Sequence, residues 1–259
     1  MLLHINVNID GFRSGMEGTL PIRDGEVPSS RKDVCSVIKY STDNIARTTR
    51  TYDILFIPEV RHMKSIILAS GSPRRKELLD QVGIPCTVDA PNVDESMPED
   101  VSPSDYVEEL SKRKALAAAG RHPGSIVLAA DTIVALGDRI LGKPADSADA
   151  YDMLRSLSGR IHSVYTGVTI IYPESTSEKS ADTFHVRTDV KMYDSDDSLI
   201  RDYAGCGEPL DKAGAYGIQG RGAVLVEKID GDYSNVKGLP VAEVYRRLYP
   251  ILKQTTDEH

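Results

Sequence analysis

From about residue 63 onward, apolar residues follow a strand-like pattern in some segments and a helix-like pattern in others, and the two kinds of segment alternate along the chain. Continuous apolar runs at 65–69 and 125–134 predict buried strands. Strict alternation of apolar and polar residues at 184–192 predicts a strand with one buried face. Between these runs, apolar residues recur three and four positions apart, which places them on one face of a helix. We therefore expect an α/β domain in which strands and helices alternate.

Capping residues and glycines mark where the predicted helices begin and end. A helix over 73–81 has Ser72 before it and Pro73 at its first position. The pattern Ser-Pro-Ser-Asp at 102–105 is a capping box that opens a helix over 103–119. Further helices are predicted over 147–157, shortly after Ser195, and over 241–252. A short apolar run near Thr87, a glycine-rich loop at 205–222 and a strand at 223–229 complete the expected elements.

The first 62 residues show no sustained helical or alternating pattern, and we interpret them as an N-terminal extension of unknown role. Met63 directly precedes the first buried strand, so it is a candidate for the true start of the protein. The predicted domain then covers 63–259. Sequencing the N-terminus of the native protein would test this hypothesis.

Composition excludes several classes of protein. At 259 residues, the chain accommodates one large domain, or a domain of about 200 residues with an extension. A formal net charge of −8 argues against a broad surface for nucleic acid, which needs clustered Lys and Arg. Three widely spaced cysteines suggest neither a disulfide framework nor a thiolate metal site, which favours a cytoplasmic location. Because no apolar run approaches the ~20 residues of a membrane helix, we expect no membrane partner.

The segment SGSPRR at 70–75 joins a predicted strand to a predicted helix. Helix N-termini bind anions through their free N–H groups. Arg74 and Arg75 stand in the first helical turn, where positive charge opposes the helix dipole unless an anion is held there. A plain capped helix with two solvated arginines explains the same residues. The segment is not a Walker A loop, which needs G-x-x-x-x-G-K-[ST].

Two further charged residues fall at apolar positions. Lys114 shares one helix face with Val107 and Leu110, so it either has a charged partner or extends its ammonium group to water. Asp131 lies inside a continuous apolar strand, where a carboxylate needs a cation, a donor or a water. Such a carboxylate suits a divalent metal or general-base chemistry, and the alternative is a structural Asp that caps a turn.

Two loops supply more polar groups. Lys143 stands before Pro144, which holds the preceding backbone extended and makes this loop stiff. The glycine-rich segment at 207–222 carries Glu208, Asp211, Lys212, Tyr216 and Gln219, and it suits ligand contact or is simply a long flexible loop. Together the candidate cations and carboxylates have the balance expected where a metal-bound polyphosphate is cut.

Seven landmarks in order resemble the Maf-like nucleoside triphosphate pyrophosphatases, from about Met63 to the C-terminal helix. They are SGSPRR at 70–75, VDE at 93–95, KA at 114–115, ADT at 130–132, GKP at 142–144, GRIHSVYT at 159–166 and GEPLDKAGAYGIQG at 207–220. The resemblance implies an elongated mixed central β-sheet flanked by helices, with two lobes framing a cleft, as in the Maf/ITPase-like folds. It also implies a homodimer and a divalent metal, Mg²⁺ or Mn²⁺.

The resemblance also implies roles for individual residues. Asp131 is similar to the family's general base, and Glu95 lies near the metal together with Asp131. The phosphate-binding set corresponds to Ser72, Arg74, Arg75, Lys114 and Lys143. Positions associated with base selection correspond to Arg74, Thr132 and Gln219.

The form KAGAYGIQ at 212–219 is similar to the branch of the family that hydrolyses dTTP and UTP. An amide such as Gln219 offers both a donor and an acceptor, as the edge of a pyrimidine requires. Three alternatives remain: hydrolysis of 7-methyl-GTP, hydrolysis of deaminated purines such as ITP, and a non-catalytic nucleotide-responsive regulator of cell division.

Overall fold

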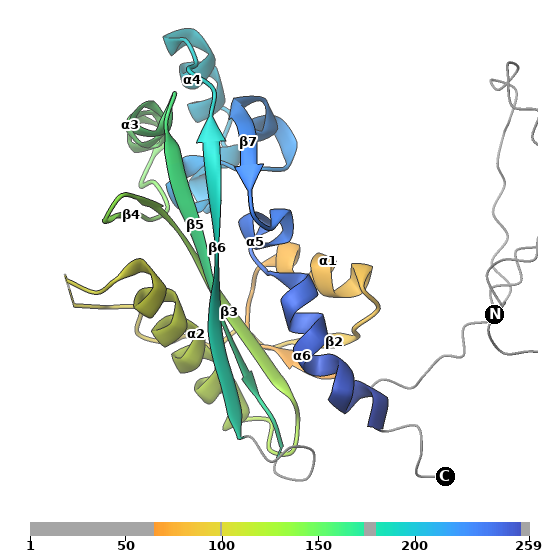
Figure 1. Ribbon diagram of the computed structural model, residues 1–259. Coiled ribbons are helices and arrows are strands. Elements are labelled where there is room, and N and C mark those ends of the chain that lie inside the picture. The colour runs from red at the N-terminus through yellow and green to blue at the C-terminus, as the bar shows by residue number, and fades with distance from the viewer. Residues whose placement is uncertain (1–64, 99, 174–179, 255–259) are drawn as a thin grey trace, which may run out of the picture. The chain divides into compact units, whose positions relative to one another are not determined.

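Within residues 65–98, 100–173 and 180–254, which the computed structural model describes, seven strands form one mixed sheet (Figure 1). Its order is β2-β1-β3-β5-β6-β7, and β4 pairs with β3. β1 is parallel to β2 and β3, and the other pairs are antiparallel. The strands are β1 (Ile66–Leu68), β2 (Cys86–Val88), β3 (Val127–Leu136), β4 (Arg139–Leu141), β5 (Ile161–Ile171), β6 (Ala181–Met192) and β7 (Val226–Asp230).

Helices cover both faces of this sheet, which confirms the expected mixed α/β architecture (Figure 1). The helices are α1 (Pro73–Gln81), α2 (Pro103–Ala119), α3 (Ser147–Leu157), α4 (Asp197–Ala204), α5 (Tyr233–Lys237) and α6 (Val241–Gln254). α2 packs small residues such as Ala115 and Ala118 against Ala129 of β3. Among the described residues, no helix has the length and apolar character needed to cross a bilayer.

The opposite face of the long strands carries two separate apolar cores. Ala130 and Val168 belong to a core that includes residues of α1 and α6. Val134 and Val164 belong to another core, with residues of α3 and α4. Between them lies one polar register pair, Thr132 on β3 and Thr166 on β5, whose hydroxyl oxygens are 2.9 Å apart. The two expected lobes therefore meet at this pair of threonines.

Beside Thr132 and Thr166, one edge of β3 has no neighbouring strand among the described residues. β1 pairs with β3 only at Val127 and Leu128, and β4 pairs with it only from Val134 onward. In the described part of the chain, the intervening stretch 129–133 has a strand partner only on its β5 side. A cleft opens at this gap, and Asp131, Thr132 and Ile133 line it.

Most boundaries predicted from the sequence are confirmed. The helices over 73–81, 103–119 and 147–157 have the expected limits, and the Ser102 hydroxyl accepts the Asp105 N–H at 3.2 Å, as the capping box requires. The pattern did not predict β5, β4 or α5. The predicted extension over 1–62, with Met63, lies outside the described residues.

The glycine-rich segment differs from one of its two interpretations, that of a long flexible loop, whereas the other, ligand contact, stays a prediction. Instead of a flexible loop over 205–222, it forms three 3₁₀ helices, η1 (Glu208–Asp211), η2 (Ala213–Ala215) and η3 (Gly220–Leu225). Because η3 runs to Leu225, the strand predicted at 223–229 begins only at Val226. The reason is that Glu208 and Tyr203 bind backbone N–H groups of the segment and hold it in tight turns.

Gly167 on β5 allows α2 to approach the sheet. A β-carbon at this position would lie 2.2 Å from the carbonyl oxygen of Val107 in α2. We predict that Gly167→Ala lowers the free energy of unfolding by about 2 kcal/mol or more, because α2 must move outward. Urea denaturation measures the change. Gly120→Ala is the matched control, since its β-carbon meets nothing closer than 3.8 Å. Equal stability of the two variants would contradict the close approach.

Candidate active site

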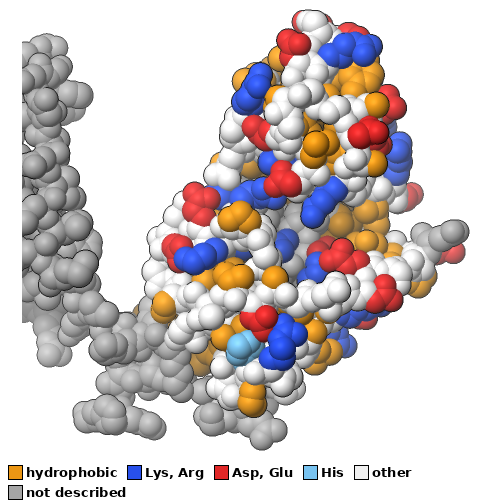
Figure 2. Space-filling model, turned by 180° about the vertical axis from the view of Figure 1, so that it is seen from behind, with side chains coloured by type: hydrophobic (Ala, Val, Ile, Leu, Met, Phe, Trp, Pro, Cys, Tyr) orange, Lys and Arg blue, Asp and Glu red, His pale blue; other side chains and the backbone are white. Residues whose placement is uncertain are grey.

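The cleft between the two lobes has a volume of about 660 Å³. Figure 2 shows basic and acidic side chains gathered around a hollow in the middle of the visible face. All nine residues to which the resemblance assigns a site role line this cleft, although they come from separate strands, helices and loops, whereas the further candidate carboxylate Glu208 does not line it. The nine are Ser72, Arg74, Arg75, Glu95, Lys114, Asp131, Thr132, Lys143 and Gln219.

The N-terminus of α1 forms one wall. Ser72 is the N-cap and Pro73 occupies the first helical position, as predicted, but the Ser72 hydroxyl makes no capping hydrogen bond. The Ser72 N–H is instead donated to the hydroxyl oxygen of Ser70 at 3.3 Å. The Ser72 hydroxyl is thus available to a ligand at a helix end that favours anions.

Arg75 uses most of its hydrogen-bond donors within the protein. Its Nε donates to the carbonyl of Gly238 at 2.8 Å, and its other nitrogens donate to the hydroxyls of Ser70 at 2.7 Å and Thr132 at 3.0 Å. Burial lowers the pKa of the guanidinium, against the charge of Asp131, which raises it. Arg75 therefore ties α1 to β3 and to the end of α5, and it keeps two of its five N–H donors for a ligand.

The hydroxyls of Thr132 and Thr166 continue the hydrogen-bonded chain that begins at Arg75. Thr166 donates to the carbonyl of Asn235 at 3.1 Å, so the proton shared by Thr132 and Thr166 belongs to Thr132. The Thr132 hydroxyl thus accepts from Arg75 and donates to Thr166 at 2.9 Å, while its alternative acceptor, the carbonyl of Gly238, is farther away at 3.4 Å. Thr132 lines the cleft with its hydroxyl already satisfied inside the protein.

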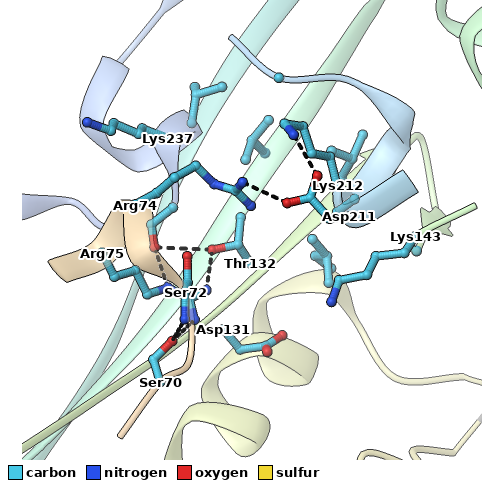
Figure 3. Close-up of a pocket in the computed structure, with 18 of the residues that line it drawn as sticks. Ser70, Ser72, Arg74, Arg75, Asp131, Thr132, Lys143, Asp211, Lys212 and Lys237 are labelled. Atoms are coloured by element: carbon cyan, nitrogen blue, oxygen red, sulfur yellow. Dashed lines mark hydrogen bonds and ion pairs between the residues drawn. The ribbon is translucent and has the colours of Figure 1, made fainter. Parts of the chain in front are cut away.

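Arg74 points across the cleft to the glycine-rich segment. Its Nη1 lies 3.1 Å from the Asp211 carboxylate, whose other oxygen lies 2.6 Å from the ammonium of Lys212 (Figure 3). Arg74 and Asp211 are both substantially exposed, so this ion pair contributes little to stability. A polyphosphate, which carries several negative charges, can replace Asp211 as the ion-pair partner of Arg74.

Lys114 and Asp131 form the buried charged pair of the cleft. The ammonium of Lys114 lies 2.6 Å from Asp131 Oδ1, and both side chains are 14% exposed. It also lies 2.7 Å from Glu95 Oε1. Burial acts to lower the pKa of Lys114, but Asp131 and Glu95 outweigh it and the pKa is raised. Lys114 therefore has the charged partner that its place on an apolar helix face requires.

Arg113, the neighbour of Lys114 on α2, holds Glu95 in place. Its Nη1 donates to the carbonyl oxygens of Asp94 at 3.1 Å and Ser96 at 2.9 Å, one on each side of Glu95. The Asp94 carboxylate accepts the Ser96 N–H at 2.9 Å and closes the turn. One helix thus positions both Lys114 and the loop that carries Glu95.

Lys143 and Gln219 are two further polar side chains of the cleft with free functional groups. Neither makes a side-chain hydrogen bond or ion pair within the described residues. Figure 3 shows the Lys143 ammonium directed into the cleft. Both groups are available to a ligand without the loss of an internal contact.

The carboxylates of the cleft fit a hard divalent cation. Among described residues, no three His, Cys, Asp or Glu side chains gather as a closed cage. Glu95 and Asp131 nevertheless converge on one positive centre, the ammonium of Lys114. Mg²⁺ is usually bound by one or two carboxylates together with substrate phosphates and waters, so this pair is suited to it.

The cleft also contains residues outside the predicted site. Ser70 sits beside Arg75, and Tyr106 on α2 lies near Asp131 and Glu95. Lys237 lines the cleft with a side chain 2% exposed, and its ammonium lies 2.9 Å from Glu77 on α1. No periodic or capping signal in the sequence singles out Lys237, because its role depends on the packing of α5 against α1.

The sheet and the cleft define an α/β protein with a pocket in which several cationic side chains stand beside two carboxylates. Residues 65–251 match the family model described as "Maf-like protein", and the chain belongs to this family.

Two relatives named "dTTP/UTP pyrophosphatase" are similar over most of their length. The protein from Bacillus mycoides is 50% identical over 186 residues, which cover 72% of this chain and 95% of the relative. The protein from Bacillus cereus is 48% identical over 190 residues, which cover 73% and 91%. A solved structure of a HAM1 protein from Coxiella burnetii has a TM-score of 0.44 and 16% identity, over 74% of this chain and 100% of that chain.

The two neighbouring arginines differ sharply in their surroundings, which yields a matched pair of variants. We predict that Arg75→Met lowers the free energy of unfolding by about 3 kcal/mol, because buried acceptors lose their donor. Arg74→Met should change it by less than about 1 kcal/mol, since its only described ion pair is exposed. Urea denaturation of both variants measures the difference. Equal losses would contradict the structural role of Arg75.

Proposed function

We propose that this chain hydrolyses nucleoside triphosphates to the nucleoside monophosphate and pyrophosphate, with dTTP and UTP as favoured substrates. The observation that carries the proposal is the Asp131 carboxylate, held by Lys114 in the middle of a cleft lined with cations. Relatives at 48–50% identity that are named dTTP/UTP pyrophosphatases support the same activity.

Asp131 is suited to act as a general base. Its Oδ1 is occupied by Lys114, and its second oxygen, which has no partner among the described residues, can accept a proton from a water. That water attacks the α-phosphorus, its proton passes to Asp131, and the bond from the α-phosphorus to the bridging oxygen breaks. The electron pair leaves with pyrophosphate.

The cations of the cleft stabilise the negative charge of the leaving group. Lys143 is free, and Arg74 becomes free when it leaves Asp211, so both can bind the outer phosphates. The N-terminus of α1 with the Ser72 hydroxyl binds a phosphate through neutral donors. These groups lie on both lobes, so a triphosphate is held across the cleft.

A divalent cation, Mg²⁺ or Mn²⁺, would be held by Glu95 and Asp131 together with the substrate phosphates. When bound, such an ion supplies additional neutralisation of phosphate charge. Arg113 keeps Glu95 in place through the carbonyls on either side of it.

Gln219 is the base-reading group in this proposal. Its amide donates and accepts, and it has no side-chain partner in the described protein, so it can pair with the adjacent carbonyl and N–H groups of thymine or uracil. Arg74 and Thr132 stand at the other positions associated with base selection.

A nucleotide panel tests the substrate. With dTTP, UTP, 7-methyl-GTP and ITP, we expect the highest kcat/KM for dTTP and UTP, with pyrophosphate rather than orthophosphate as product. A chelator should stop the reaction, and Mg²⁺ or Mn²⁺ should restore it. Preference for 7-methyl-GTP or ITP would replace the pyrimidine assignment, and nucleotide binding without any turnover would favour a regulatory protein.

Asp131→Asn tests the mechanism. We expect kcat to fall by about a hundredfold or more, because the general base is lost while the shape of the side chain is kept. Nucleotide affinity, measured by calorimetry, should persist because a negative charge near the phosphates is removed. Asp138→Asn, in the exposed turn between β3 and β4, is the control. Unchanged turnover in Asp131→Asn would remove this residue from the mechanism.

A further inference from the structure

The segment that carries Gln219 is tethered on both sides of this residue. The N–H of Gly217 donates to the Tyr203 hydroxyl at 3.1 Å. The N–H groups of Arg221 and Gly222 donate to the Glu208 carboxylate at 3.0 and 3.2 Å. The stretch 218–220 between these tethers is thus held at its two ends.

Glu208 and Tyr203 act as one unit. The Tyr203 hydroxyl donates to Glu208 Oε1 at 3.0 Å, so the tether before Gln219 and the tether after it are joined. Burial acts to raise the pKa of Glu208, but the backbone N–H groups and Tyr203 outweigh it, and the pKa is lowered. The carboxylate therefore stays ionised and accepts three hydrogen bonds.

The fit around this carboxylate is close. A β-carbon on Gly220 would lie 2.8 Å from Glu208 Oε2, and one on Gly222 would lie 2.5 Å from the Tyr203 hydroxyl. Glycines at these positions let the backbone fold tightly over the two side chains. Neither Glu208 nor Tyr203 lines the cleft within the described structure, so neither is placed to contact the nucleotide.

A further contact holds the segment at Tyr216, the residue before Gly217. The hydroxyl of Tyr216 lies 2.7 Å from Nε2 of His162 on β5, and both side chains are buried. Burial lowers the pKa of His162 to about 4, so the imidazole is neutral at physiological pH. This neutral contact fixes the segment to the sheet and leaves Glu208 to set the local shape around Gln219.

We propose that Glu208, joined to Tyr203, is a positioning residue that sets nucleobase selectivity by holding the backbone on both sides of Gln219. This inference rests on the proposed function, in which Gln219 reads the base. A donor–acceptor side chain discriminates between bases better when the backbone that carries it is fixed, because a mobile backbone presents the amide to several partners. The chemistry at the phosphates depends on Asp131 and Lys114, which belong to other elements.

The test compares kcat/KM for dTTP with that for dGTP in the full chain. We expect Glu208→Gln to lower this ratio about tenfold, because the new NH₂ group cannot accept from a backbone N–H. The loss should appear mainly as a higher KM for dTTP, with kcat changed less than about threefold. Tyr203→Phe removes one hydroxyl from the other side of Gln219 and should lower the ratio in the same direction. Glu227→Gln, at an exposed position on β7, is the matched control and should leave the ratio unchanged.

A double-mutant cycle separates positioning from general loss of structure. If Glu208 acts through Gln219, adding Glu208→Gln to Gln219→Ala should change the ratio less than about twofold. An unchanged ratio in both Glu208→Gln and Tyr203→Phe would overturn the inference, as would an equal loss in the Gln219→Ala background. The wild-type measurement distinguishes the two proposals. Absence of pyrophosphate release from every nucleotide contradicts the proposed function, whereas a selective wild type with selective variants contradicts only the inference.

Discussion

The ion pair between Asp131 and Lys114 is the interaction on which the rest of the cleft depends. A carboxylate inside an apolar strand is tolerated because an ammonium group lies 2.6 Å away. That ammonium comes from α2, which can lie close to the sheet only because Gly167 has no side chain. Gly167 is also the register partner of Asp131 on the neighbouring strand. The glycine and the charged pair are thus two parts of one local arrangement.

The cleft divides its polar groups into those that build the site and those that remain free for a ligand. Arg75, Thr132 and Thr166 satisfy one another in a chain that crosses from α1 to α5. Lys143, Gln219 and the Ser72 hydroxyl keep their hydrogen-bonding capacity. A rigid frame with a few free groups lowers the entropy lost on binding, because few side chains need to be ordered again.

Glu95 and Gln219, which belong to different loops, are positioned in the same way, by hydrogen bonds to the backbone on both sides of the residue. Arg113 binds the carbonyls on either side of Glu95, and Glu208 with Tyr203 binds the N–H groups on either side of Gln219. In both cases the backbone is held and the side chain lines the cleft, where Glu95 pairs with Lys114 and Gln219 has no side-chain partner among the described residues. Both loops line the cation-lined cleft of this member of the Maf-like family.

The sequence alone determined the limits of the longer helices, because capping residues and glycines are local signals. A charge at an apolar position singled out Asp131 and Lys114, whereas the roles of the other candidate site residues were predicted from the resemblance to a family. It did not reveal β5, since its residues alternate poorly and become a strand only between β3 and β6. It also read 205–222 as a loop, although contacts from Tyr203 and Glu208 fold it into 3₁₀ turns. Only the tertiary structure decided that Arg75 is an internal tie and that Lys114 joins Asp131 to Glu95. It also decided that Lys237 lines the cleft while its ammonium pairs with Glu77. Those roles depend on distances between elements far apart in the chain, which no local pattern records.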